Sequence, residues 1–210
     1  MTRKVLVTGY LGGIGSAIFE KLERHSWNVE GFDVSESTVR KPIPDPEGFT
    51  HIVAAHGLLN IPGTSTDSMW KANYRSLTEW ADGFLAGANT FERKCFIAIT
   101  SNSADIPRRN SMEYCASKAA ADMAMRVYNR ENVHRGVEFY SLALGPVMTE
   151  RTEYLYEKLG PGALENHLSR IPVGFMMRPE DVASWVLFIL DNPAAKWASG
   201  TTLRLDGGEL

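Results

Sequence analysis

The chain has 210 residues, of which 44% are hydrophobic and 22% charged, and its formal net charge is −3. This length suits one well-packed domain and is too short for two. The slightly acidic balance gives no electrostatic reason to bind nucleic acid or an anionic membrane. No run approaches the ~18 apolar residues that span a bilayer, and no signal-peptide pattern precedes the first predicted strand, so we expect a cytoplasmic protein.

Hydrophobic periodicity divides the chain into alternating strands and helices. In chain order it predicts strand 4–8, helix 13–25, strand 28–33, strand 51–55, helix 67–88, strand 94–100, helix 111–132, strand 137–143, helix 179–191 and strand 201–206. Such alternation is typical of a parallel sheet that helices cover on both faces. The sequence therefore predicts an α/β fold: a Rossmann-type doubly wound parallel sheet in three α/β/α layers. We expect one domain over residues 1–210, with a substrate lid at about 150–178.

A glycine-rich turn joins the first predicted strand to the first helix. Gly9 permits a tight turn there, and Gly12, Gly13, Ile14 and Gly15 follow it. The glycines allow the backbone to approach a pyrophosphate, which the free N–H groups of the helix N-terminus bind. A tight turn that binds nothing is the alternative interpretation, but the position between a strand and a helix favours a dinucleotide.

The second predicted strand ends in a carboxylate, Asp33. A carboxylate at this point accepts hydrogen bonds from the diol of an adenosine ribose, and its charge repels a 2′-phosphate. Asp33 therefore favours NAD as the cofactor over NADP.

Tyr114 and Lys118 stand four residues apart, on one face of the predicted helix 111–132. A tyrosine with a pKa near ~10 is a poor base at neutral pH, but a fixed positive charge close by favours the phenolate. Lys118 can supply that charge, so the pair can transfer protons. A tyrosine that packs on a lysine stem is the plainer alternative. The dinucleotide pattern elsewhere in the chain favours the catalytic interpretation.

These residues together resemble the short-chain dehydrogenase/reductase family over nearly the whole chain. The family's glycine motif is similar to Thr8–Gly15, and its Tyr-xxx-Lys motif to Tyr114 and Lys118. Its catalytic serine is identified as Ser101, at the end of a predicted strand, with Ser103 as the fallback. The further matches are Asn73, the segment that contains Gly145, Val147 and Thr149, and the terminal Ser199-Gly200 with Asp206-Gly207-Gly208.

The resemblance implies an oxidoreductase that transfers a hydride between a nicotinamide cofactor and the CH–OH or C=O group of a small molecule. Tyr114 would be the acid and base, Ser101 would hold the substrate oxygen, Lys118 would also bind the nicotinamide ribose, and Asn73 would hold a water. No metal site is expected. The implied cofactor-binding residues are Gly9, Gly12, Gly13, Ile14, Gly15, Asp33, Ala54, Ala55, His56, Gly57, Tyr114, Lys118, Gly145, Val147 and Thr149.

The chain departs from the family pattern in three places. The family's Asn-Asn-Ala-Gly is replaced by Ala54–Gly57, so we expect backbone support for the cofactor there and a structural role for His56. The family's later proline is Leu144. The connection between Asp33 and Ala54 is about half as long as in the family, so we expect a shortened strand around Val39–Ile43 and a more open adenine pocket. Within this connection Arg40 and Lys41 are the two residues that could instead reach a 2′-phosphate.

The lid composition favours an apolar or aromatic alcohol or ketone as the substrate. Arg108 and Arg109 could bind a substrate carboxylate, which is the less favoured hypothesis. The apolar and aromatic lid residues are Tyr154, Leu155, Tyr156, Leu159, Phe175, Met176 and Met177, and they could equally serve lid packing.

Two other functions fit the fold. A catalytically silent dinucleotide-sensing or scaffold protein would be expected to have replaced Tyr114 or Lys118, and a lyase of the halohydrin-dehalogenase type would carry arginine for Lys118. The chain keeps both residues.

The helices 67–88 and 111–132 carry apolar residues on more than one face, which predicts a homodimer or homotetramer. The residues concerned are Trp70, Trp80, Phe84, Leu85, Met123, Met125 and Val127.

Overall fold

A six-stranded sheet forms the middle layer of the molecule in the computed structural model, which describes residues 3–34, 43–59, 63–88 and 92–209. The strand order is β2-β1-β3-β4-β5-β6, and every pairing is parallel. This arrangement confirms the predicted Rossmann-type fold. The strands are β1 (Lys4–Thr8), β2 (Asn28–Phe32), β3 (His51–Ala54), β4 (Lys94–Ser101), β5 (Val137–Leu144) and β6 (Thr202–Leu205).

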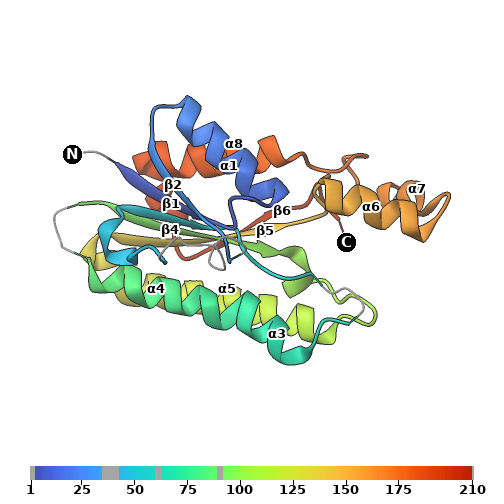
Figure 1. The fold of residues 1–210 in the computed structure, drawn as a ribbon, viewed down its shortest axis with the longest axis horizontal. Coiled ribbons are helices and arrows are strands. Elements are labelled where there is room, and N and C mark those ends of the chain that lie inside the picture. Colours follow the sequence, from blue (N-terminus) through green and yellow to red (C-terminus); the bar gives the residue numbers. More distant parts are fainter. Residues whose placement is uncertain (1–2, 35–42, 60–62, 89–91, 210) are drawn as a thin grey trace.

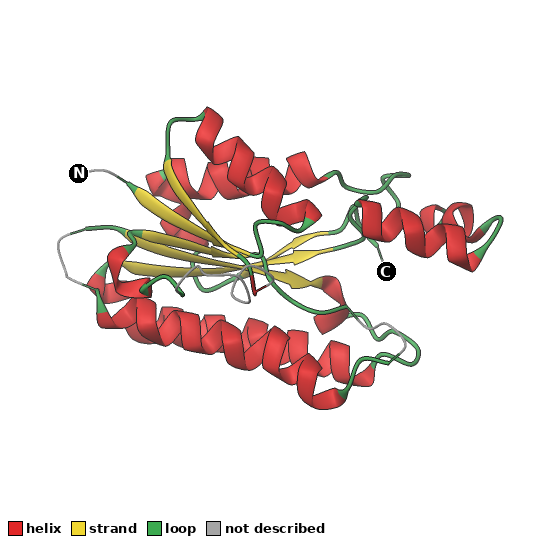
Figure 2. Ribbon diagram, in the orientation of Figure 1, coloured by secondary structure: helices red, strands yellow, loops and turns green. Residues whose placement is uncertain are grey.

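Helices cover both faces of the sheet (Figures 1 and 2). One layer contains α1 (Gly13–Arg24) and α8 (Pro179–Asp191). The other contains α3 (Thr66–Trp70), a π-helical turn η2 (Lys71–Arg75), α4 (Ser76–Ala86) and α5 (Met112–Asn132). Short 3-10 turns complete the description: η1 (Pro46–Gly48), η3 (Asn102–Ala104), η4 (Val133–Arg135) and η5 (Pro193–Ala198).

The sheet buries a separate apolar cluster on each face, because successive strand residues point to opposite sides. In β1, Val5 packs with the α1 and α8 layer while Leu6 packs with the α4 and α5 layer. In the second cluster the rings of Phe84, Phe96 and Phe139 follow one another, with centroids 5.8 and 5.4 Å apart. All three rings are fully buried, and each such side chain contributes roughly 2–3 kcal/mol of transfer free energy.

A helical hairpin projects beyond the carboxyl ends of β5 and β6. It consists of α6 (Glu150–Leu159) and α7 (Ala163–Leu168), drawn in orange in Figure 1. A parallel bridge between Val147 and Met177 closes its base, where the Met148 N–H donates to the Met177 carbonyl at 2.9 Å. We call residues 148–177 the lid.

The structure differs from the sequence prediction in one helix, and a second predicted element lies almost entirely outside the described residues. The predicted helix 67–88 is divided into α3, η2 and α4, because the π turn directs a polar side chain, Asn73, into the interior. The predicted short strand around Val39–Ile43 falls almost entirely outside the described residues, as do Arg40 and Lys41; Ile43 itself lies in a loop.

The apolar residues that predicted an assembly differ in their exposure. Phe84 and Met125 are fully buried against the sheet. Met123 and Val127 on α5 are 55% and 46% exposed and remain available to a partner. Within the described residues, no helix combines the length and apolar character that a membrane crossing requires.

Candidate active site

Three of the predicted catalytic side chains meet where β4 ends and α5 begins. Ser101 is the last residue of β4, and its hydroxyl lies beside the phenol of Tyr114 in the first turn of α5, close enough to influence the pKa of that phenol. Lys118 follows one helical turn later, with its Nζ 5.9 Å from the centroid of the Tyr114 ring. The ammonium donates to the Ile99 carbonyl at 3.5 Å and is buried.

Burial governs the charges of this group. It raises the pKa of Tyr114, although the neighbouring Ser101 hydroxyl works in the other direction. This is opposite to the lowered pKa expected from the sequence, because desolvation of the phenolate outweighs the charges that favour it. Burial also lowers the pKa of Lys118 to about 8, against the attraction of Asp122. At neutral pH the site therefore holds a cationic lysine beside a protonated phenol.

Asn73 joins this group from the opposite side. It lies in the π turn η2, a feature that is frequent at functional sites, and is only 3% exposed, which excludes a solvated surface position. Its Oδ1 accepts from the Leu58 N–H at 2.8 Å, and its Nδ2 donates to the Leu58 carbonyl at 3.0 Å and to the Ser117 hydroxyl at 3.2 Å. Gly57 separates it from Lys118: a Cβ there would stand 2.8 Å from Asn73 Oδ1 and 3.4 Å from Lys118 Nζ.

His56 is held as a neutral ring between β1 and α4. The Ser76 hydroxyl donates to the Ala72 carbonyl at 2.9 Å, so it accepts from Nε2–H of His56, also at 2.9 Å. The other ring nitrogen, Nδ1, then accepts from the Thr8 hydroxyl at 2.6 Å. Burial, and next the charge of Lys118, lower the pKa of His56 to about 4. These contacts fit the structural role expected from the sequence.

The glycine turn packs too closely for side chains. Gly9 has φ +72°, and a Cβ on it would lie 2.8 Å from the His56 backbone. A Cβ on Gly15 would lie 2.1 Å from the Gly9 carbonyl oxygen. The N-cap of α1 is Gly12, which offers no side-chain acceptor, and no acidic residue stands in the first turn of this fully described helix. The N-terminal N–H groups of α1 are thus available to an anion such as a diphosphate.

The other predicted cofactor residues lie along the same edge of the sheet. Asp33 follows β2, and Ala54 ends β3, where the Ala55 N–H donates to the Thr8 carbonyl at 3.1 Å. Thr149, the N-cap of α6, approaches the glycine turn, since a Cβ on Gly13 would lie 3.0 Å from its methyl carbon. The remaining members at this edge are Ile14, in the first turn of α1, and Gly145 and Val147, which follow β5.

The structure also answers the question of the two loop arginines. Arg108 donates to the buried Glu209 at 2.7 Å and to Asn102 Oδ1 at 3.2 Å, so its charge is already matched, whereas Arg109 is exposed. Sequence reasoning missed Glu209.

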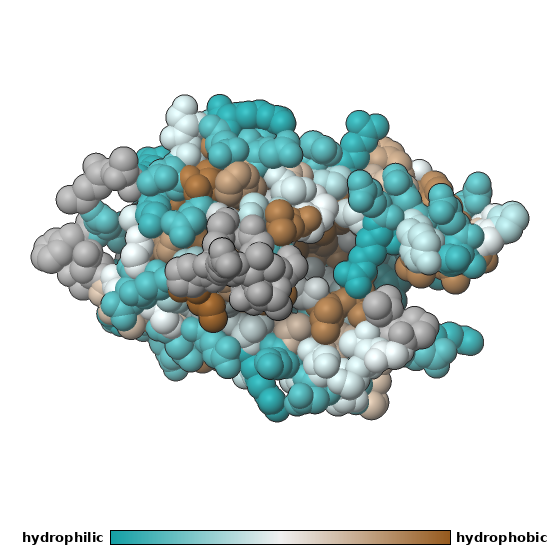
Figure 3. All heavy atoms as spheres, in the orientation of Figure 1, coloured by the Kyte–Doolittle hydropathy of each residue, from teal (hydrophilic) through white to brown (hydrophobic). Residues whose placement is uncertain are grey.

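In Figure 3 the lid overhangs a notch in the surface and shows apolar atoms on its underside. Exposed apolar side chains of the lid are Tyr154, Leu155, Leu159, Val173 and Phe175.

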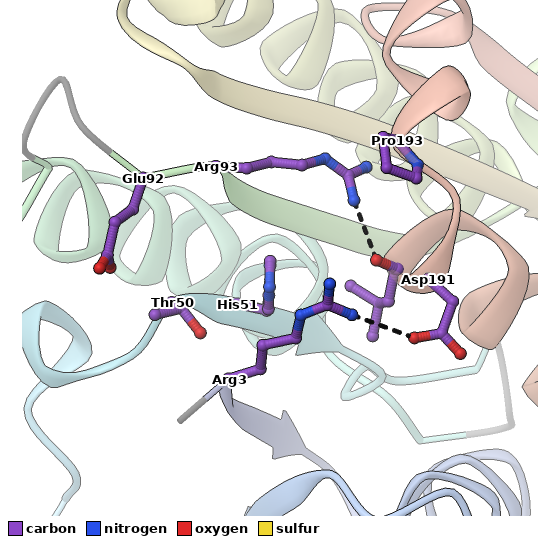
Figure 4. A pocket seen from close by; sticks show the side chains of 8 residues that line it. Arg3, Thr50, His51, Glu92, Arg93, Asp191 and Pro193 are labelled. Atoms are coloured by element: carbon purple, nitrogen blue, oxygen red, sulfur yellow. Dashed lines mark hydrogen bonds and ion pairs between the residues drawn. The ribbon is translucent and has the colours of Figure 1, made fainter. Parts of the chain in front are cut away.

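A separate pocket opens at the opposite edge of the sheet, where the strands begin (Figure 4). Its two arginines are engaged: Arg93 pairs with Glu138 at 2.7 Å, and Arg3 with Asp191 at 3.4 Å. This pocket lies at the amino ends of the strands, whereas the residues described above gather at the carboxyl ends, where ligands of open α/β sheets bind. The pocket is therefore not the active-site candidate.

The chain is similar to known proteins over most of its length. The family model described as Enoyl-(Acyl carrier protein) reductase matches residues 47–209. The chain is 26% identical to the vibriobactin-specific 2,3-dihydro-2,3-dihydroxybenzoate dehydrogenase of Vibrio cholerae and 25% identical to the L-xylulose reductase of Caenorhabditis elegans. Each match covers 98% of this chain and 95% of the relative.

The chain also superposes on a solved oxidoreductase from Burkholderia thailandensis, which is described as a member of the short chain dehydrogenase/reductase family. The TM-score is 0.85 and the sequence identity 21%, and the match covers 99% of this chain and 92% of that one. The family match and the full-length relatives together define both the family and the class of reaction. The chain belongs to the short-chain dehydrogenase/reductase family and is an NAD(P)-dependent oxidoreductase acting on CH–OH groups.

Proposed function

We propose that Tyr114 is the acid and base of this oxidoreductase and that Ser101, Lys118 and Asn73 support it. The observation that carries the proposal is the position of the Tyr114 phenol beside the Ser101 hydroxyl, within reach of a buried cation. A phenol and a hydroxyl placed side by side can both contact a single substrate oxygen. That is the arrangement which proton transfer to or from an alcohol requires.

The nicotinamide of NAD(P), when bound, supplies the hydride acceptor for an alcohol or the hydride donor for a ketone. In reduction the protonated Tyr114 gives its proton to the carbonyl oxygen. In oxidation Tyr114 acts from its phenolate form, which takes the alcohol proton. Ser101 holds the substrate oxygen in place, a task for which a fixed hydroxyl suffices. The cationic Lys118 stabilises the phenolate while Tyr114 lacks its proton. Asn73 keeps the Leu58 segment beside Lys118 through its two hydrogen bonds to that backbone.

The glycine turn and the uncapped start of α1 would hold the diphosphate of the cofactor. Gly9, Gly12, Gly13, Ile14 and Gly15 form this cradle, and the crowding at two of its glycines explains why larger residues do not fit. The backbone of Ala54–Gly57 would line the same edge, and Gly145, Val147 and Thr149 would contact the nicotinamide end. His56 would contribute backbone contacts only, because both of its ring nitrogens are engaged.

NAD is the proposed physiological cofactor, because Asp33 would accept hydrogen bonds from the ribose diol and repel a 2′-phosphate. Structures that share this fold at low sequence identity contain either cofactor: one from Agrobacterium tumefaciens has bound NADP, and a 7α-hydroxysteroid dehydrogenase is complexed with NADH. The choice between the two therefore rests on Asp33.

The proposed substrate is a small apolar or aromatic alcohol or ketone. Four lid side chains support this, since Tyr154, Leu155, Leu159 and Phe175 are between 43% and 62% exposed. The pairing of Arg108 with Glu209 removes the main support for an acidic substrate. We further propose a homodimer or homotetramer whose interface includes the exposed side of α5.

The test is the Tyr114→Phe variant, assayed with NAD and a panel of alcohols. The ring is retained and only the proton-transferring oxygen is lost, so turnover should fall by at least ~100-fold while the dissociation constant for NADH stays within about twofold. The fluorescence of the reduced nicotinamide measures the binding of NADH, and Tyr128→Phe, which removes a phenol near the C-terminal end of α5, is the matched control. Activity above a few per cent of wild type in Tyr114→Phe would exclude Tyr114 as the acid and base.

A further inference from the structure

A buried carboxylate next to the active site has no part in the mechanism above. The Glu209 side chain is 1% exposed and lies in the tail that follows β6. Arg108 Nη1 donates to its Oε1 at 2.7 Å, and Asn102 Nδ2 donates to its Oε2 at 2.9 Å. His167 Nε2 lies 3.3 Å from the same Oε1 that Arg108 binds. Side chains from the β4–α5 loop and from the lid thus converge on one group.

The loop side of this cluster is firmly built. Asn102 directly follows Ser101, and its Nδ2 also lies 3.3 Å from Asp206 Oδ2. Arg204 hydrogen-bonds both the Asp206 carboxylate and the backbone carbonyl of Glu209. Both the side chain and the backbone of Glu209 are therefore fixed relative to the loop that carries the catalytic serine.

On the lid side of the cluster, two hydrogen bonds run in series from Tyr156 to His167 and from His167 to Glu209. Because His167 Nε2–H donates to Glu209, the other ring nitrogen accepts from the Tyr156 hydroxyl, which is hydrogen-bonded to it. His167 belongs to α7 and Tyr156 to α6, so the pair spans both helices of the lid. A second contact lies nearby, where the Val173 N–H donates to the Gly207 carbonyl at 3.1 Å.

The two sides differ in strength. The contact between Arg108 and Glu209 is short and joins two opposite charges, whereas the His167 contact is longer and involves a ring that burial keeps neutral by lowering its pKa. Although burial opposes ionisation of Glu209, the hydrogen bonds from Arg108 and Asn102 hold its pKa at about 2, so the carboxylate stays charged throughout the neutral range. The His167 contact is therefore the weaker of the two side-chain contacts to Glu209.

We propose that Glu209 is a positioning residue that couples the placement of the substrate lid, through His167, to the loop that carries Ser101, through Arg108 and Asn102. With the contact formed, the lid lies in register with the serine that holds the substrate oxygen. With it broken, α6 and α7 swing away while Arg108 and Asn102 retain Glu209 on the catalytic side. The coupling to catalysis rests on the proposed role of Ser101; the lid contact itself does not.

The experiment compares Glu209→Gln and His167→Phe with Glu131→Gln, an exposed change of the same charge on α5. Hydrogen–deuterium exchange reports the lid without any need for activity. Exchange over residues 150–168 should rise at least ~3-fold in both variants and stay at the wild-type rate in the control. Exchange over residues 102–110 should rise in Glu209→Gln alone, because His167→Phe leaves the loop contacts intact.

Steady-state kinetics then separate positioning from a merely structural role. Glu209→Gln should raise KM for the substrate and lower kcat/KM by at least ~10-fold, while the dissociation constant for NAD(P) stays within about twofold. If Glu209→Gln does not fold, His167→Phe alone decides the question. Unchanged lid exchange in His167→Phe would overturn the proposal. Faster lid exchange with unchanged kcat/KM would refute the coupling to catalysis, and an active Tyr114→Phe enzyme would separately refute the proposed function.

Discussion

Two histidines, the buried His51 and the half-buried His56, should make this protein lose stability between pH 7.5 and pH 5. His51 and His56 stand at and just beyond the two ends of β3 and are held neutral. Burial, reinforced by the charge of Arg93, lowers the pKa of His51 to about 3, and burial with Lys118 lowers that of His56 to about 4. In the unfolded chain both titrate near ~6.5. The unfolded state therefore binds more protons than the folded state once the pH falls below that value.

The sign and size follow from proton linkage. A histidine whose pKa is lowered by folding contributes stability that is present above its unfolded pKa and is lost as the pH falls toward its folded pKa. From pH 6.5 to pH 5 each of the two loses about 1.4 kcal/mol per pH unit, or about 2 kcal/mol, which makes about 4 kcal/mol for the pair. Glu209, whose pKa is about 2, loses its contribution only below pH 4.5, outside this window.

The assay is urea unfolding at pH 7.5, 6.0 and 5.0. His56→Gln keeps hydrogen-bonding groups, and His51→Phe keeps a ring against Trp27, whose centroid lies 5.3 Å away. Each variant should lose about 2 kcal/mol less between pH 7.5 and pH 5 than the wild type does, whereas His25→Gln at the exposed end of α1 should follow the wild type. A wild-type loss below ~1 kcal/mol, or the same slope in all four proteins, would refute the reasoning.

The remaining predictions concern the cofactor, the lysine and the assembly. Gly15→Ala should abolish NAD binding and destabilise the fold by more than ~2 kcal/mol in urea unfolding, because its Cβ would stand 2.1 Å from a backbone oxygen. The control is Gly48→Ala, since a Cβ on Gly48 would have nothing within 4 Å. Equal stabilities of the two variants would contradict the packing argument. The dissociation constants measured by fluorescence should favour NAD over NADP by at least ~10-fold, or ~1.4 kcal/mol, through Asp33, and comparable constants would overturn that preference. Asp122→Asn should move the alkaline limb of kcat/KM to lower pH, because Asp122 raises the pKa of Lys118; an unmoved limb would show that the lysine does not set it. Sedimentation equilibrium at micromolar protein should find a dimer or larger species, and a single 23.3 kDa species would refute the assembly.

Local patterns predicted the part of the site that is built from contiguous sequence. The glycine turn, Ser101 and the pair Tyr114 and Lys118 all fall on the predicted elements, because strand and helix periodicity fixes which end of each strand carries the next loop. The parallel sheet then brings those ends together. Such reasoning needs no contact between distant side chains.

Long-range contacts explain what sequence reasoning missed. Glu209 and Arg108 are separated by 101 positions, and nothing in either neighbourhood identifies the other as its partner. The π turn at Asn73 depends on the Leu58 backbone, which lies on a separate loop, so helix periodicity alone predicted one continuous helix. The raised pKa of Tyr114 was also missed, since the degree of burial, rather than the motif, sets its direction.

The closed base of the lid makes it an exchangeable unit. Val147 and Met177 meet in a parallel bridge, so about thirty residues leave the body of the protein and return to it at one point. A segment whose ends are joined in this way can change in length and composition with little entropic cost to the sheet, since the loop-closure term grows only slowly with length. Lids from other members could therefore be grafted at this bridge, to test the proposed role of the lid in substrate preference, while β1, β4 and α5 keep the glycine turn and Tyr114 unchanged.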